Sequence, residues 1–93
     1  MLERRVVIRN RLGLHARAAA RLVRVANSYH SAVRLERIDG SHSADAKSIL
    51  SVLMLAAGFG TELRAIVYGE DEDEAINALC TLIAEGLGEE GRQ

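Results

Sequence analysis

The sequence predicts an α+β domain in which helices cover one face of a small antiparallel sheet. Apolar and polar side chains alternate in four short segments, and apolar residues recur at helical spacing in three others. Along the chain these segments follow one another in the order β-α-β-β-α-β-α. Helices that are segregated from a small sheet are most simply layered on one of its faces. We expect the other face to be solvated, because arginines occupy alternate strand positions.

Length and composition limit the class of protein. A chain of 93 residues with 48% hydrophobic residues can bury one modest core, so we expect one domain over residues 1–88 and a flexible tail over 89–93. The single cysteine, Cys80, excludes a disulfide framework. No apolar run is long enough to span a membrane, and the N-terminus lacks a signal-peptide core. We therefore expect a cytoplasmic protein without membrane insertion.

The net charge of −1 conceals a division of the chain. Residues 1–38 carry nine arginines against two glutamates, a charge of +7, whereas residues 39–93 carry three cations against eleven acids, a charge of −8. This division indicates either internal neutralisation or a basic face offered to an anionic partner.

The first half of the chain predicts a strand, a turn and a helix. Val6 and Ile8 mark the buried face of the strand, and residues 10–13 turn the chain. Over residues 16–27 the spacing predicts an amphipathic helix. Its expected buried stripe is Ala16, Ala19, Ala20, Val23 and Ala26, and its polar stripe is Arg17, Arg21, Arg24 and Ser28.

Two strands and a short helix are expected next. Val33 and Leu35 mark a second strand, Asp39-Gly40 is typical of a hairpin, and residues 41–45 should return as a weak third strand. The apolar run over residues 49–57 predicts a short helix, ended by Gly58 and Gly60.

The last two elements are a strand and a helix. The strand is marked by Leu63, Ala65 and Val67. Asp71 followed by Glu74 predicts a capping box at the start of the final helix, which Gly86 ends. Its apolar stripe is Ala75, Ile76, Leu79, Leu82 and Ile83.

The stretch Leu12-Gly-Leu-His-Ala-Arg17 is the best candidate for chemistry. It places His15 where a glycine-containing loop enters a helix, and helix N-termini attract anions. Arg17 adds a permanent cationic donor in the first turn. A histidine there can carry a phosphoryl group, since that transfer needs mainly positioning and electrostatics. Taken alone, the same residues also fit an ordinary helix cap.

Two longer motifs resemble one known family. Asn10-Arg-Leu-Gly-Leu-His-Ala-Arg-Ala-Ala-Ala20 and Ala46-Lys-Ser-Ile-Leu-Ser-Val-Leu-Met-Leu55 are similar to the active-site and regulatory-serine segments of HPr, the histidine phosphocarrier of the bacterial phosphoenolpyruvate-dependent phosphotransferase system. The resemblance covers essentially the whole chain. It implies an HPr-like open-faced β-sandwich, with a four-stranded antiparallel sheet and three helices on one face.

The resemblance also implies roles for particular residues. His15 matches the histidine phosphorylated at Nδ1, Arg17 matches the arginine that assists transfer, and Ser48 matches the serine targeted by HPr kinase/phosphorylase. The protein would then be a carrier without turnover or cofactor of its own, passing a phosphoryl group from enzyme I to IIA-type proteins. From the residues alone, Ser48 also fits a helix N-cap.

A docking surface follows from the same comparison. Ile49, Leu50 and Leu53 match the apolar patch with which HPr binds its partners, and the surrounding cations are Arg17, Arg21, Arg24 and Lys47. An apolar centre with a charged rim suits a transient encounter. A helix buried on two sides would explain the same apolar residues. We expect a monomer.

Several questions stay open in the sequence. Ala18 stands where the family usually has proline, and alanine should preserve the helix. The segments Asn10-Arg-Leu-Gly and Leu53-Met-Leu55 resemble the nitrogen branch of the family (NPr), whereas Lys47-Ser48-Ile49 resembles the kinase-regulated type, so the choice between sugar and nitrogen branch stays open. The alternatives from other classes are an arginine-helix module that binds nucleic acid or anions, and a ferredoxin-like regulatory domain. Scarce aromatics speak against nucleic acid, and His30, His42 and Cys80 lack metal-ligand spacing.

Overall fold

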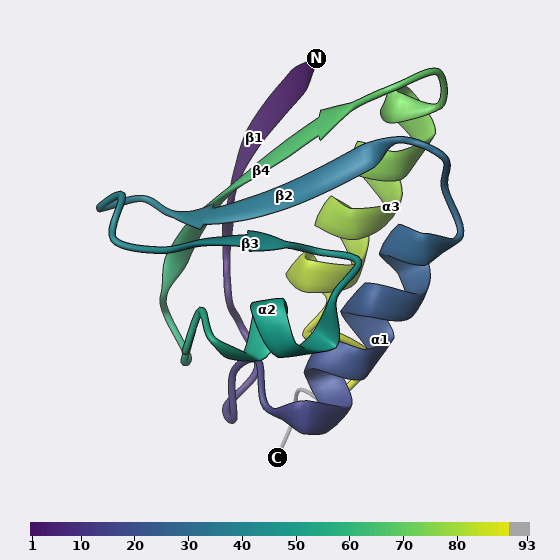
Figure 1. The fold of residues 1–93 in the computed structure, drawn as a ribbon. Helices are drawn as coiled ribbons and strands as arrows, with labels where there is room; N and C mark the ends of the chain where they lie inside the picture. Colours follow the sequence, from purple (N-terminus) through teal and green to yellow (C-terminus); the bar gives the residue numbers. More distant parts are fainter. Residues whose placement is uncertain (90–93) are drawn as a thin grey trace.

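Four antiparallel strands form one sheet in the computed structural model, which describes residues 1–89. Their order across the sheet is β1-β4-β2-β3, and their bounds are Leu2–Val7 for β1, Ala32–Arg37 for β2, Ser43–Asp45 for β3 and Glu62–Tyr68 for β4. The N-terminal strand β1 therefore pairs with β4, from the second half of the chain (Figure 1). The predicted fold class and element order are confirmed.

Three helices cover one face of this sheet (Figure 1). They are α1 (Ala16–Asn27), α2 (Ile49–Leu53) and α3 (Glu72–Ala84). Leu63, Ala65 and Val67 of β4 point toward the helices and are buried, whereas the residues between them are not. In the described part of the chain, no helix has the length and apolar character needed to cross a membrane.

The opposite face of the sheet is solvated, as predicted, and carries an ion-pair network. Arg64 of β4 lies 2.7 Å from a carboxylate oxygen of Glu3 on β1 and 3.2 Å from one of Glu36 on β2. The three strands are therefore linked by charges on the face that the helices leave open. In exposed positions such pairs contribute little stability, so the core on the other face holds the sheet together.

The buried face of α1 differs from the prediction. Its buried residues are Ala18, Ala19, Leu22 and Ala26, while Ala16 is exposed and Ala20 and Val23 are only partly buried. Alanines occur on several sides of this helix, so spacing alone could not locate the buried stripe. Leu22 determines which side of α1 faces the core, because burying a leucine removes more apolar surface from water than burying an alanine.

The apolar run after Ser48 forms a shorter helix than predicted. α2 ends at Leu53, because Leu55 and Ala56 bond back only three residues and Ala56 adopts a left-handed φ of 51°. The chain then turns, and Leu55 and Ala57 are buried outside the helix. The predicted helix end at Ala57 is therefore wrong by four residues. β3 is also shorter than predicted, whereas β1 begins earlier, at Leu2.

The predicted capping box on α3 is wrong. Asp71 occupies the N-cap position but its carboxylate does not cap the helix. Instead it accepts the backbone N–H groups of His30 and Ser31, at 2.9 Å each, and the Ser31 hydroxyl at 2.5 Å. A local sequence signal was overridden because the loop before β2 supplies three donors to the same carboxylate.

Candidate functional site

His15 lies at the N-cap position of α1, as the sequence predicted. Its backbone is extended, with φ −74° and ψ 179°, and its carbonyl accepts the N–H of Ala19 at 2.8 Å. Its side chain turns back onto the helix, where Nδ1 accepts the backbone N–H of Arg17 at 3.3 Å. Because Nδ1 accepts a hydrogen bond, it carries a lone pair, and in the neutral ring the proton is on Nε2.

A tightly held loop over residues 10–14 sets the position of His15. Gly13 has a φ of 67°, and its N–H donates to the Asn10 carbonyl. A Cβ on Gly13 would lie 2.5 Å from the carbonyl oxygen of Ala57, so only glycine fits there. The next residue, Leu14, is buried and donates its N–H to that same oxygen at 2.9 Å.

The segment after α3 completes the site. Gly86, Leu87 and Gly88 all have left-handed φ values, between 59° and 84°, which turn the chain back toward α1. Glu89 follows them, and its Oε2 lies 2.5 Å from Nε2 of His15. Sequence reasoning placed Glu89 in the tail and missed it, although two glycines flanking Leu87 signal a turn. Residues 90–93 of that tail lie outside the described part of the chain.

Asn10 holds the other oxygen of Glu89. The Asn10 side chain is buried, and its Nδ2 donates to Oε1 of Glu89 at 2.8 Å and to the Gly13 carbonyl at 2.7 Å. The donated Asn10 hydrogen bond, and after it the His15 contact, lower the pKa of Glu89 below its usual value. Glu89 therefore remains a carboxylate under ordinary conditions, beside the proton-bearing nitrogen of His15.

The three arginines of α1 differ in their surroundings. Arg17 and Arg24 are exposed. Arg21 is partly buried and donates to the Leu87 carbonyl at 3.1 Å, so it holds the turn that carries Glu89. Among residues 1–89, no carboxylate forms an ion pair with any of the three. The exposed pair is therefore the part of the basic stripe that is open to a partner.

Ser48 lies at the N-cap of α2, where its Oγ accepts the N–H of Ser51 at 3.3 Å. The preceding Lys47 is anchored, since its ammonium donates to the Tyr29 carbonyl at 2.8 Å and its own carbonyl accepts Asn27. These contacts place Ser48 near the C-terminal end of α1. The structure thus separates Ser48 from His15, which caps the other end of that helix.

Exposed apolar side chains gather on and around α2. Leu50 and Met54 are 71% and 73% exposed, Ile49 is 40% exposed, and Leu53 packs partly against the core. The sequence prediction included Ile49, Leu50 and Leu53 but omitted Met54. Large apolar side chains this exposed are typical of interaction surfaces when they cluster. Because α2 contacts α1, these apolar side chains lie beside the helix that carries His15 and Arg17.

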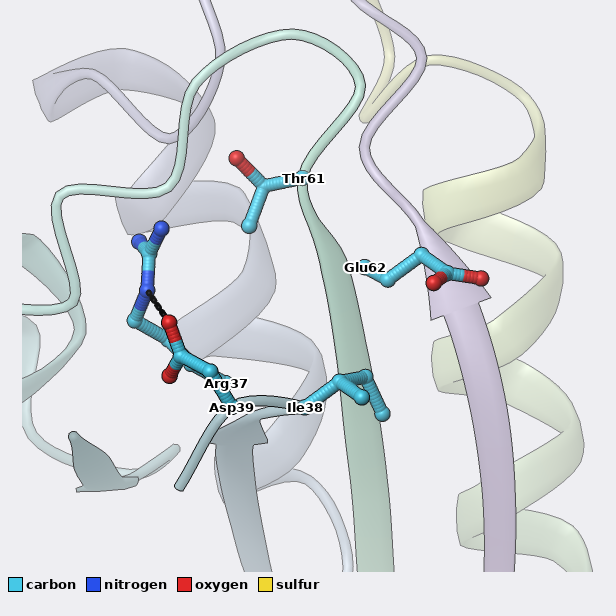
Figure 2. Close-up of a pocket in the computed structure, with 5 residues that line it drawn as sticks. All are labelled: Arg37, Ile38, Asp39, Thr61 and Glu62. Carbon is cyan, nitrogen blue, oxygen red and sulfur yellow. Dashed lines mark ion pairs between the residues drawn. The ribbon is translucent and has the colours of Figure 1, made fainter. Parts of the chain in front are cut away.

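A hollow of about 300 Å³ lies elsewhere, where β2 ends and β4 begins. Figure 2 shows its lining residues, Arg37, Ile38, Asp39, Thr61 and Glu62. Arg37 is 4.0 Å from Asp39 and also donates to the Leu55 carbonyl at 2.8 Å. Its guanidinium therefore supports the turn after α2, and the hollow brings together no reactive group.

Comparison with known proteins points to one family. The family model described as "PTS HPr component phosphorylation site" matches residues 2–85. A phosphocarrier protein HPr from Cupriavidus necator is 47% identical over 96% of this chain and 98% of its own length. A phosphocarrier protein NPr from Shewanella violacea is 40% identical over 88% of each chain. The crystal structure of HPr-C-His from Thermoanaerobacter tengcongensis gives a TM-score of 0.89 at 38% identity, over 97% of this chain and 99% of that one.

Proposed function

This chain belongs to the HPr family of phosphocarrier proteins of the phosphotransferase system, and on that premise we propose that Nδ1 of His15 receives the phosphoryl group. The observation that supports this is the Arg17 N–H donated to Nδ1, which requires a lone pair and not a proton on that nitrogen. We propose phosphorylated enzyme I as the donor and a IIA-type protein as the acceptor. A carrier of this kind would act in the cytoplasm.

Transfer to His15 needs little beyond geometry and charge. The Nδ1 lone pair forms the bond to phosphorus, while the bond to the donor breaks and its electron pair returns to the donor. The phosphoryl oxygens would then sit at the N-terminus of α1, where free N–H groups and the helix dipole favour negative charge. Arg17, exposed in the first turn, adds a cation beside them.

The direct test is phosphorylation by phosphoenolpyruvate and enzyme I. We expect acid-labile phosphate on the wild-type protein and none on His15→Ala, because the nucleophile is gone. His42→Ala is the matched control, since His42 is also a histidine but is exposed in the β2–β3 hairpin. Equal labelling of wild type and His15→Ala would contradict the proposal.

The exposed side chains of α2 support a docking role. We propose that Ile49, Leu50 and Met54 form the apolar centre of the partner-binding surface, with Leu53 behind them and Arg17 and Arg24 at its rim. Arg21 and Lys47 would act mainly by holding the surface, because each is already bound to a backbone carbonyl.

Ser48 is proposed as a regulatory phosphorylation site. A phosphate on an N-cap oxygen is compatible with the helix, so its charge would change docking at α2 rather than unfold the protein. We expect HPr kinase with ATP to give acid-stable phosphate on wild type and none on Ser48→Ala, with Ser51→Ala as the matched control. Phosphate that persists in Ser48→Ala would contradict the assignment.

A further inference from the structure

We propose that Glu89, held by Asn10, is a positioning residue that selects the reactive tautomer of His15. This inference rests on the proposed function of His15. A neutral imidazole carries its proton on either nitrogen, and only the form with the proton on Nε2 leaves Nδ1 free to attack phosphorus. The structure places a carboxylate oxygen of Glu89 at 2.5 Å from Nε2, and a carboxylate can only accept a proton donor there.

Both ring nitrogens are therefore specified by their neighbours. The Arg17 N–H requires a lone pair on Nδ1, and Glu89 requires a proton on Nε2. One contact is local and the other comes from 74 residues further along the chain, and both favour the same tautomer. A histidine oriented by a carboxylate at one nitrogen and reactive at the other is a recurring arrangement in histidine chemistry.

Glu89 is itself held in place, as a positioning residue must be. Asn10 Nδ2 donates to Oε1 of Glu89 and also binds the Gly13 carbonyl of the loop that precedes His15. Arg21 binds the carbonyl of Leu87 two residues earlier. The carboxylate is therefore fixed to the same loop and helix that carry the histidine, so its distance from Nε2 depends on short, local connections.

The charge balance of the transfer gives Glu89 a second effect. When Nδ1 forms its bond to phosphorus, the ring keeps the Nε2 proton and becomes cationic. Glu89 is the carboxylate in contact with that proton, and Arg21 is the cation close enough to lower the pKa of Glu89. The Arg17 N–H loses its acceptor when Nδ1 is substituted and can donate to a phosphoryl oxygen instead. On transfer to the acceptor, the electron pair returns to Nδ1 and no proton has to move.

Nitrogen NMR of the His15 ring tests the tautomer without any partner protein. In the wild type we expect ¹⁵N shifts and couplings of a neutral ring protonated on Nε2. In Glu89→Ala we expect a mixture of the two tautomers, because one of the two selecting contacts is lost. Glu85→Ala, which removes an exposed carboxylate at the end of α3, should leave the wild-type spectrum. Identical ring spectra for Glu89→Ala and wild type would overturn the inference.

Transfer kinetics with enzyme I separate positioning from docking. We expect kcat to fall about tenfold in Glu89→Ala with KM little changed, by analogy with the lower end of the loss seen when a metal-binding histidine loses its outer hydrogen-bond partner. A rise in KM alone would assign Glu89 to docking and overturn the inference. If the wild type takes up no phosphate, the proposed function fails while the NMR result still stands, so the two failures are distinguishable.

Discussion

At the scale of single residues, the site depends on groups that each satisfy two neighbours. The Asn10 amide is the main example, since its Nδ2 binds both the Gly13 carbonyl and Glu89. Its Oδ1 is buried and has no hydrogen-bond partner among the described residues. Reversing the amide would set that oxygen against a carbonyl and a carboxylate. The observed orientation is therefore the less costly of the two, although a buried unpaired acceptor costs about 1–3 kcal/mol.

Gly13→Ala tests how closely the loop before His15 packs. Its Cβ would meet the Ala57 carbonyl and add to the strain of a positive φ, so we expect the free energy of unfolding to fall by roughly 3 kcal/mol. Gly40→Ala is the matched control, because Gly40 also has a positive φ but an added Cβ meets nothing within 4 Å. Its loss should be about 1–2 kcal/mol, from backbone strain alone. Urea denaturation measures both values, and equal losses would contradict the close contact.

Asp71 predicts a specific acid sensitivity. The Ser31 hydroxyl, and then the N–H of His30, lower the pKa of Asp71 from 3.8 to about 2. Since the folded-state pKa is depressed, this stabilisation is fully present above pH 3.8 and is lost as the pH falls toward 2. Asp71→Ala should therefore be less stable than wild type at neutral pH, and the difference should disappear near pH 2. Asp73→Ala, at an exposed position in the same helix turn, is the control for urea denaturation across this range.

At the scale of elements, α2 carries two kinds of residue on five positions. Val52 is fully buried, whereas Leu50 is 71% exposed. The short helix therefore contributes one face to the core and offers the other to a partner. Its contact with α1, and the Lys47 bridge to the loop after α1, keep this outer face near the basic stripe.

Alanine substitutions in α2 should separate these two roles. We expect Leu50→Ala to leave the free energy of unfolding within about 0.5 kcal/mol of wild type and to raise KM for enzyme I about tenfold. Val52→Ala should do the reverse, lowering stability by about 2 kcal/mol with little change in KM. Urea denaturation and steady-state phosphotransfer measure the two effects, and a loss of stability in Leu50→Ala would contradict the docking assignment.

The elements also show what could be predicted from the sequence. Strand alternation, the bounds of α1 and the place of His15 were all predicted, because each depends on a local pattern that the fold retains. The rotation of α1, the early end of α2 and the use of Asp71 were not. Each of these is decided by contacts with distant residues. Glu89 belongs to the same group, since nothing near it in the sequence indicates that it lies against His15.

At the scale of the whole molecule, some arginines are paired with carboxylates and others form no ion pair among the described residues. On the open face of the sheet, Arg64 is paired with Glu3 and Glu36. On the helix side, Arg17 and Arg24 form no ion pair with residues 1–89. The Arg64 pairs join a cation of the acidic half to the two glutamates of the basic half, so they do not neutralise the basic excess. Of the two interpretations of the charge division, Arg17 and Arg24 therefore favour a basic face that is available to an acidic partner.

The exposed arginines on the helix side predict that binding to enzyme I depends on salt concentration. We expect KM for enzyme I to rise with ionic strength, because screening shortens the reach of exposed charges to about 10 Å at 0.1 M salt. Arg24→Gln should make that rise shallower. Arg34→Gln is the matched control, since Arg34 is an exposed arginine of β2 on the open face of the sheet. Equal changes in both variants would show that net charge, and not a docking face, sets the dependence.

The contacts between residues 10–15 and Glu89 determine when the site can assemble during synthesis of the chain. On the ribosome, the loop and its histidine emerge early, yet β1 finds its partner only when β4 has been synthesised. The carboxylate that contacts Nε2 arrives later still, after the whole of α3. Because domains are translated from the N-terminus at about 5–20 residues per second, His15 spends several seconds as an unassembled side chain. On the proposed function of His15, we expect a nascent chain to be a poorer phosphoryl acceptor than the complete fold, in which the last helix has folded back over the first.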